Sequence, residues 1–206
     1  MSLLTLAAGL EAIVAPHAAK VAPVVVVERA EWLDAPLAQA EAAMRSQHDD
    51  AVAATTAAVR VMYKRIGVDP TKTRPSSEAL LRRVRKGQPL PRVNSAVDVI
   101  NWTSVETQLP FGLYDADRIE GEVVARLGEP GESYAGIRKD EVHVAGRFVV
   151  ADAKGAFGNP TSDSLRTSVT VETTALLVVV FAPAGGRAGE GEAALALAVR
   201  RLQGEW

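Results

Sequence analysis

Residues 175–182 read ALLVVVFA, the longest apolar run in the later part of the chain. Aliphatic and β-branched residues without polar alternation are typical of a strand that is buried on both faces. With eight residues, the run is far shorter than the roughly 20 apolar residues that a membrane-spanning helix needs. It therefore predicts a buried strand inside a globular protein.

The segment before this strand is polar. Residues 159–174 read NPTSDSLRTSVTVETT and are rich in short hydroxyl, amide and carboxylate side chains. Such residues form Asx and Ser/Thr turns that stabilise a long connection. They also line pockets, which often form at the mouth of a buried strand. Both interpretations of the segment stay open at this point.

Working outward, the pattern predicts an α+β fold in which helices precede most strands. Apolar residues at helical spacing indicate two helices over residues 37–65, and Gly, Asp and Pro clusters separate short strands after residue 110. Further expected helices cover residues 78–86, with Ser76 or Ser77 as cap, 95–106, with Asn94 as cap, and 192–203. Expected strands cover residues 21–28, 112–114, 121–126, 142–144, 147–152 and 175–181.

The composition is that of a globular protein, with 48% hydrophobic and 23% charged residues among 206. No cysteine is present, which excludes disulfides, thiolate nucleophiles and thiolate metal sites. The three histidines lie far apart without metal-ligand spacing, so we expect no metal and no cofactor. No Lys or Arg precedes Lys20, as a secretory signal would require, and a soluble cytoplasmic protein without membrane contact is expected.

Charge is unevenly distributed along the chain. The net charge is only −2, but residues 60–92 hold ten basic and two acidic residues, a local balance of +8. A face with such a charge attracts phosphate backbones. Solvated helix faces are the simpler interpretation, since Tyr63 is the only aromatic residue among the basic ones. Candidate RNA-binding residues are Arg74, Arg82, Arg83, Arg85 and Lys86.

The sequence NSAVDVIN at residues 94–101 places three polar residues on one stripe of the expected helix. Asn94, Asp98 and Asn101 recur at spacings of four and three residues. Because Val97 and Ile100 face inward, the stripe borders the core and is able to present acceptors to a cleft. A helix cap followed by solvated positions explains the same pattern.

Four segments, taken together in this order, resemble a known family. They are RPSSEALLRR (74–83), PLPRVNSAVDVINWTSV (89–105), LPFGLYDADRIEG (109–121) and NPTSDSLRTSVTVETT (159–174). The chain resembles the B3/B4 domain of the phenylalanyl-tRNA synthetase beta subunit, in its free-standing bacterial form. The resemblance spans residues 60–182. We expect residues 1–206 to form a single domain. Residues 1–59 add a strand and helices, and residues 183–206 a Gly-rich linker and a helix.

The resemblance implies a layered β-sandwich flanked by helices, with a helical N-terminal portion. In the synthetase this domain hydrolyses tRNA that carries a wrong, tyrosine-like amino acid. By resemblance, Asp98 and Asn101 are the candidate catalytic residues. The candidate substrate-binding residues are Asn94, Val97, Phe111, Gly112, Tyr114, Asp115 and Thr173. The expected partners are tRNA or aminoacyl-tRNA and an amino-acid-like small ligand.

Two positions depart from the family pattern. Bacterial synthetases carry a histidine where Gly112 stands, and an acidic residue that recognises the wrong side chain aligns near Leu165. Ester hydrolysis on tRNA needs chiefly a positioned water and fixed donors for the developing oxyanion. Carboxylates available to orient that water are Asp98, Asp115, Asp163 and Glu172.

Three functions are therefore considered. The first is a deacylase that acts in trans on mischarged aminoacyl-tRNA. The second is a non-catalytic module that binds RNA or an amino-acid-like ligand. The third is a protein-interaction domain that uses the Ala-rich residues 37–58.

Overall fold

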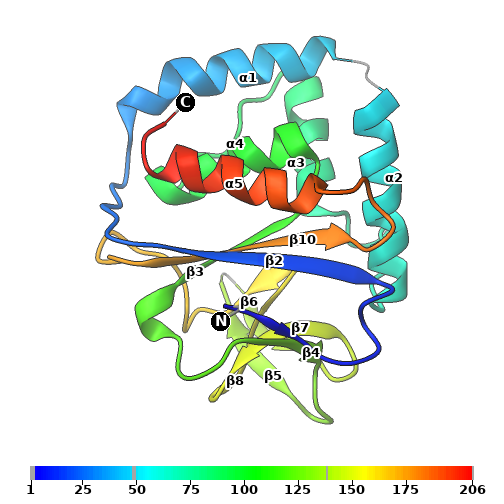
Figure 1. The fold of residues 1–206 in the computed structure, drawn as a ribbon. Coiled ribbons are helices and arrows are strands. Elements are labelled where there is room, and N and C mark those ends of the chain that lie inside the picture. The colour runs from blue at the N-terminus through cyan, green and yellow to red at the C-terminus, as the bar shows by residue number, and fades with distance from the viewer. Residues whose placement is uncertain (1–2, 48–49, 138, 206) are drawn as a thin grey trace.

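The computed structural model describes residues 3–47, 50–137 and 139–205. The elements form three layers: a layer of helices, a three-stranded sheet and a second, five-stranded sheet (Figure 1). The fold is α+β, as the sequence predicts. Within the described residues, none of the helices combines the length and hydrophobicity that a membrane crossing requires.

The central sheet has the order β2-β10-β3 and consists of β2 (Val14–Val21), β10 (Leu176–Pro183) and β3 (Phe111–Asp115). β10 lies in the middle and pairs antiparallel with both neighbours. Every residue of β10 is buried. The apolar run at residues 175–182 thus forms a strand that is covered on both faces, as the sequence predicts.

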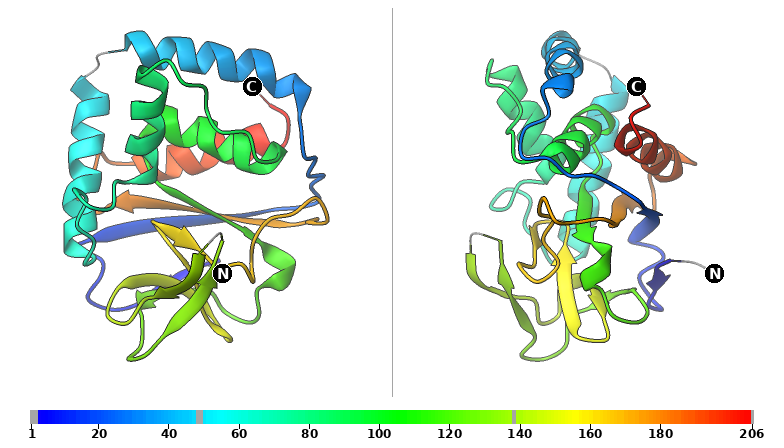
Figure 2. Two further views of the ribbon diagram at one scale, coloured as in Figure 1. Left: turned by 180° about the vertical axis from the view of Figure 1, so that it is seen from behind. Right: turned by 90° about the vertical axis from the view of Figure 1, so that its left-hand side faces the viewer.

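The second sheet has the order β1-β4-β7-β8-β9, and a separate hairpin of β5 and β6 lies beside it (Figure 2). The five-stranded sheet contains β1 (Thr5–Leu6), β4 (Val124–Leu127), β7 (Phe148–Asp152), β8 (Gly155–Asn159) and β9 (Ser162–Asp163). The hairpin contains β5 (Ser133–Gly136) and β6 (Lys139–His143).

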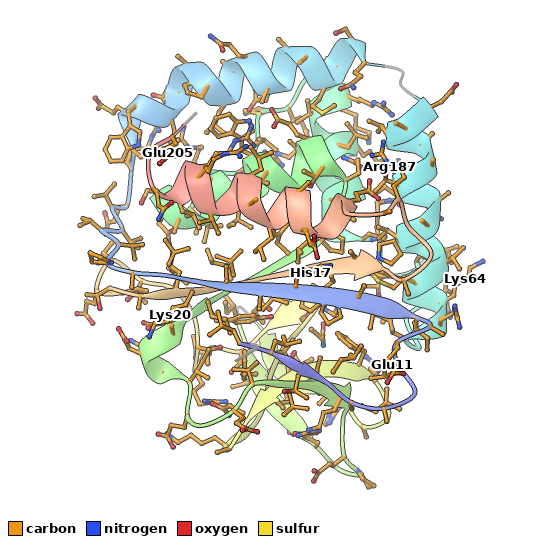
Figure 3. All side chains as sticks on the ribbon, viewed as in Figure 1. Glu11, His17, Lys20, Lys64, Arg187 and Glu205 are labelled. Atoms are coloured by element: carbon orange, nitrogen blue, oxygen red, sulfur yellow. The ribbon has the colours of Figure 1, made fainter. Side chains whose placement is uncertain are left out.

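The helices lie on the other side of the central sheet, and the second of them also reaches the core between the two sheets. They are α1 (Asp34–Ser46), α2 (Asp50–Arg65), α3 (Ser76–Arg85), α4 (Ser95–Thr107) and α5 (Glu190–Leu202), with short 3-10 helices η1 (Glu31–Leu33) and η2 (Ala116–Arg118). Figure 3 shows His17 on β2 beneath α5, and Lys64 on the outer side of α2. The side chains of Leu37, Ala40 and Met44 on α1 are buried in a core shared with α3 and α4. The apolar face of α1, in the first part of the Ala-rich segment, is therefore buried inside the molecule.

Alternate residues of β10 enter two different cores. Leu177, Val179 and Phe181 join the core between the two sheets, where Phe148 and Phe181 meet edge to face with ring centroids 5.9 Å apart. Leu176 and Val178 pack under α4 and α5. Alternation of side chains along a strand is what divides one apolar run between two layers.

Two local expectations are wrong. Residues 21–28 are not a strand: β2 ends at Val21, and Pro23 follows, which has no N–H to donate to a ladder. Neither serine caps α3, which has Pro75 at its N-cap and contains Ser76 and Ser77 inside the helix. The Asn94 cap of α4 is confirmed, since its side chain accepts from the Val97 N–H at 2.9 Å.

The ring of Tyr114 fills the space between two glycines from different sheets. A Cβ at Gly112 would lie 2.2 Å from the Tyr114 hydroxyl oxygen, and one at Gly158 would lie 2.3 Å from it. Tyr114 itself is fully buried and contacts Phe157 edge to face, with centroids 4.8 Å apart. Side chains at these two positions are excluded by sterics alone.

We expect Gly112→Ala to lower the free energy of unfolding by about 1–3 kcal/mol, the usual effect of overpacking a core. Gly185→Ala is the control, because nothing lies within 4 Å of a Cβ placed there. Its effect is expected to stay within about 0.5 kcal/mol. Urea unfolding monitored by circular dichroism measures both. Equal stabilities for the two variants would contradict the packing described.

Candidate functional site

A cavity of about 300 Å³ opens between the helical layer and the end of β8. α3 and α4 form one wall of the cavity, and the segment 159–163 at the β8–β9 turn forms the opposite wall. Its lining residues are Ser76, Leu80, Ile100, Asn101, Ser104, Phe111, Ile137, Asn159, Pro160, Thr161, Ser162 and Asp163. We call this cavity the α4 pocket.

Tyrosines from two elements hold the wall at 159–163 through its backbone. The Tyr63 hydroxyl, from α2, donates to the carbonyl oxygen of Pro160 at 2.7 Å. The Tyr134 hydroxyl, from β5, donates to the carbonyl oxygen of Ser162 at 2.6 Å. Both bonds join residues far apart in sequence, so they orient the turn relative to the helices and to the hairpin.

Asn159 forms the turn itself. Its Oδ1 accepts from the N–H groups of Thr161, at 2.8 Å, and Ser162, at 3.0 Å. Its Nδ2 donates to the Tyr134 hydroxyl at 3.1 Å. The sequence left turn formation and pocket lining as alternative roles for this polar segment. Residues 159–163 both form a turn and line the pocket.

Asp163 is the one ionisable residue among the described residues that line the α4 pocket. Burial raises the pKa of its carboxyl to about 7, and the neighbouring Tyr114 hydroxyl lowers it in part. Oδ1 of Asp163 and the hydroxyl of Tyr114 are both buried, and neither has a well-formed hydrogen bond within the described part of the chain. A carboxyl that titrates near neutral pH inside a pocket is typical of functional sites.

Asn101 and Phe111 are the predicted site residues that the structure places in the α4 pocket. Asn101 lies on the second turn of α4 and is half-buried. Phe111 begins β3 and is half-buried as well. Gly112 and Tyr114 lie beneath the pocket, where the tyrosine hydroxyl approaches Asp163.

The rest of the expected polar stripe does not reach the pocket. Asn94 caps α4, and Val97 receives that cap bond. The Asp98 side chain has no exposed surface, and its Oδ2 accepts from Arg92 Nε at 2.6 Å. Helix side chains tilt toward the N-terminus, so Asp98 reaches back to residues 92 and 93 while the pocket borders later turns. Asp98 is therefore a positioning residue for the start of α4.

Asp115 and Thr173 lie at the opposite end of β3 from Phe111. The Thr173 hydroxyl donates to Asp115 Oδ2 at 2.8 Å, and both residues are buried. Asp115 also approaches Arg118, with 3.3 Å between the charged groups. These residues fasten the polar segment to the central sheet and do not line the α4 pocket.

Several basic residues predicted to bind RNA surround a second cavity, of about 680 Å³, between α2 and α3. Arg82, Arg85 and Lys86 line this groove, which we call the α2–α3 groove. Arg74 instead pairs with Glu78, with 3.2 Å between Nε and Oε1. Arg83 donates from Nε to the carbonyl oxygen of Pro89 at 2.5 Å.

Sequence reasoning missed Tyr63 and Tyr134 as site-forming residues, whereas Asn159 lies in the segment for which pocket lining was one interpretation. The one available signal was that the chain contains only three tyrosines. The negative charge of Asp163 contributes to the raised pKa of all three phenols. In the part of the chain that the structure describes, no three His, Asp or Glu side chains gather in an arrangement that could hold a metal ion.

These positions predict different effects for two substitutions on α4. Asp98→Ala removes the buried acceptor of Arg92 and of the Val93 N–H, so we expect a loss of about 1–3 kcal/mol in unfolding free energy. Asn101→Ala leaves no such donor behind, and a loss of about 0.5 kcal/mol or less is expected. Chemical denaturation measures both. A stable Asp98→Ala protein would overturn the positioning role.

Comparison with known proteins places these observations in a family. The model of the B3/4 domain matches residues 58–187. The phenylalanine–tRNA ligase beta subunit of Psychrobacter arcticus is 34% identical over 87 residues, which is 41% of this chain and 11% of the relative. That of Cutibacterium acnes is 33% identical over 88 residues, 42% of this chain and 10% of the relative.

The chain thus spans about a tenth of the length of these relatives. Among solved structures, an N-terminal fragment of the phenylalanyl-tRNA synthetase beta subunit from Pyrococcus horikoshii covers 97% of this chain. That match has a TM-score of 0.49 and 16% identity and takes in 48% of the fragment. Since the family model covers more than half of its residues, the chain belongs to the B3/4 domain family.

Proposed function

We propose that this protein hydrolyses mischarged aminoacyl-tRNA in trans, with the aminoacyl end held in the α4 pocket. The observation that carries the proposal is the pocket itself: a polar wall at 159–163 faces Asn101 across a cavity of about 300 Å³. A cavity of this size, with one apolar side and a few convergent polar groups, suits a small ligand. The similarity to tRNA ligase beta subunits supports the tRNA context.

The chemistry requires a positioned water and donors for the developing oxyanion. Water attacks the ester carbonyl carbon, the bond to the ribose oxygen breaks, and the proton of the water passes to that oxygen, so that an amino acid and uncharged tRNA result. The Asn101 side-chain amide supplies a donor on α4. Asp163 supplies a carboxylate on the same polar wall, next to the bound ester.

α3 connects this pocket to the basic surface. Ser76 and Leu80 lie on its pocket side, while Arg82, Arg85 and Lys86 lie on its groove side. Phosphates held along the α2–α3 groove would therefore be one helix away from the pocket. Residues 1–206 act as one unit in this proposal, because α5 packs on the central sheet beside α4. The proposed place of action is the cytoplasm, where tRNA is charged.

The test is a panel of correctly and incorrectly charged tRNAs incubated with the purified protein, with ester loss measured against a buffer control. We expect faster loss for at least one mischarged pairing and a reduction of about 10- to 100-fold in that rate for Asn101→Ala. Gln39→Ala, an exposed amide lost from α1, is the control and leaves the rate unchanged. No acceleration for any pairing would overturn the deacylase.

A second candidate is a non-catalytic module that binds RNA. One observation that favours it is the groove lined with Arg82, Arg85 and Lys86. Another is Gly112: the resemblance implies a histidine at this position, and here the Tyr114 ring fills the space that such a side chain would need. Both functions share the groove, so they differ only in turnover.

Either function predicts that affinity for tRNA falls steeply with salt concentration, because phosphate contacts release counterions. Replacing Arg82 and Lys86 together by Ala is expected to reduce the slope of log affinity against log salt by about one unit for each lost contact. The double variant of Arg147 and Arg200, two exposed arginines outside the groove, is the matched control. Identical slopes for both double variants would contradict RNA binding in this groove.

A further inference from the structure

Among the side chains that the structure describes, the α4 pocket contains a single ionisable group and no cation. That group is Asp163, and the other described lining residues are apolar or neutral polar. No ion pair of Asp163 occurs among the residues that the structure describes, whereas ion pairs hold the buried Asp98 and the half-buried Glu132. A carboxylate withdrawn from water without a cation is costly, and a cationic ligand removes that cost.

The groups that face Asp163 are tyrosines from three different elements. They are Tyr63 on α2, Tyr114 on β3 and Tyr134 on β5. Burial raises the pKa of each phenol well above its usual value, so all three remain neutral at physiological pH. They therefore supply no positive charge to the carboxylate, and two of them are already engaged with backbone carbonyls.

The remainder of the pocket separates into a polar and an apolar side. Asn101, Ser162 and Thr161 lie with Asp163 on the polar side, while apolar surface comes from Leu80, Ile100, Phe111 and Ile137. A ligand that fits both sides has an apolar body and one positive polar end. A ligand carboxylate finds no positive partner among the lining residues that the structure describes, and it meets the charge of Asp163.

We propose that Asp163 binds the α-ammonium group of an aminoacyl ester, and that the pocket thereby selects amines whose carboxyl group is esterified over free amino acids. This rests on the proposed function, because it assigns the substrate class of the same pocket. In the ester the only charge near the reacting carbon is the ammonium. Hydrolysis creates a carboxylate beside Asp163, and repulsion between the two favours release of the amino acid.

The pH dependence follows from the titration of Asp163. Because the pKa of its carboxyl in the free protein is about 7, the group is protonated and uncharged at pH 5. An ammonium binds only the ionised form, so affinity rises with pH up to about 7. At higher pH the ligand amine loses its own proton, with a usual pKa of about 8. Affinity is therefore expected to pass through a maximum slightly above neutral pH.

Binding is tested with three matched probes, L-phenylalaninamide, 3-phenylpropionamide, which lacks the amine, and free L-phenylalanine. Isothermal titration calorimetry at pH 7 is expected to give at least 10-fold tighter binding for the first than for either of the others. Asp163→Asn is expected to lower the affinity for L-phenylalaninamide about 10-fold and to leave that for 3-phenylpropionamide unchanged. Glu172→Gln, an exposed carboxylate outside the pocket, is the control and changes neither.

A second measurement keeps the test independent of how well the variant folds. In the unsubstituted protein, the preference for L-phenylalaninamide over 3-phenylpropionamide is expected to fall about 10-fold for each pH unit below 7, as the carboxylate becomes protonated. A preference that does not change between pH 5 and 7, or no preference at all, would overturn the inference.

The outcomes also separate the inference from the proposed function. Amine selectivity without ester hydrolysis on any charged tRNA overturns the deacylase and leaves Asp163 as the ammonium site of a binding module. Ester hydrolysis without amine selectivity overturns the inference about Asp163 and leaves the deacylase standing.

Discussion

The structure depends on burying both faces of β10. The backbone of β10 pairs with β2 on one side and with β3 on the other. Contacts between β10 and the other layers are therefore made by its side chains. One set of residues meets the five-stranded sheet and the alternate set meets α4 and α5. Every layer therefore takes its position from one strand, and apolar surface on both faces supplies most of the free energy that holds the layers together.

The pocket depends on a second constraint, imposed by tyrosines that come from three elements. Hydroxyls of Tyr63 and Tyr134 hold the backbone at 160 and 162, so the turn cannot move without breaking bonds to both α2 and β5. Preorganisation of this kind is what binding and catalysis require, since a fixed wall loses little conformational entropy when a ligand arrives. Together with Tyr114, these phenols surround the carboxylate of Asp163 and bring no positive charge to it. The tyrosines thus make the pocket wall rigid and also surround Asp163 with neutral groups.

Much of the fold follows from local pattern, whereas the site follows only in part. The helices at residues 95–107 and 190–202 and the strand at 176–183 have strong periodicity or composition, and sequence alone located them to within a few residues. The short strand GAFGN at 155–159 was missed because glycines interrupt its alternation. Asn101 reaches the pocket as expected, but Asp98 does not, because its partner Arg92 is a loop residue whose direction no spacing rule provides. Contacts such as Tyr63 to Pro160, across 97 residues, come from tertiary packing alone.

The two glycines that border Tyr114 have a consequence for how this sequence can change over time. Gly112 and Gly158 sit on different sheets, and one phenol ring occupies the volume that a side chain at either would need. Positions 112, 114 and 158 consequently form one unit of substitution: a side chain at 112 or 158 requires a smaller or differently placed residue at 114.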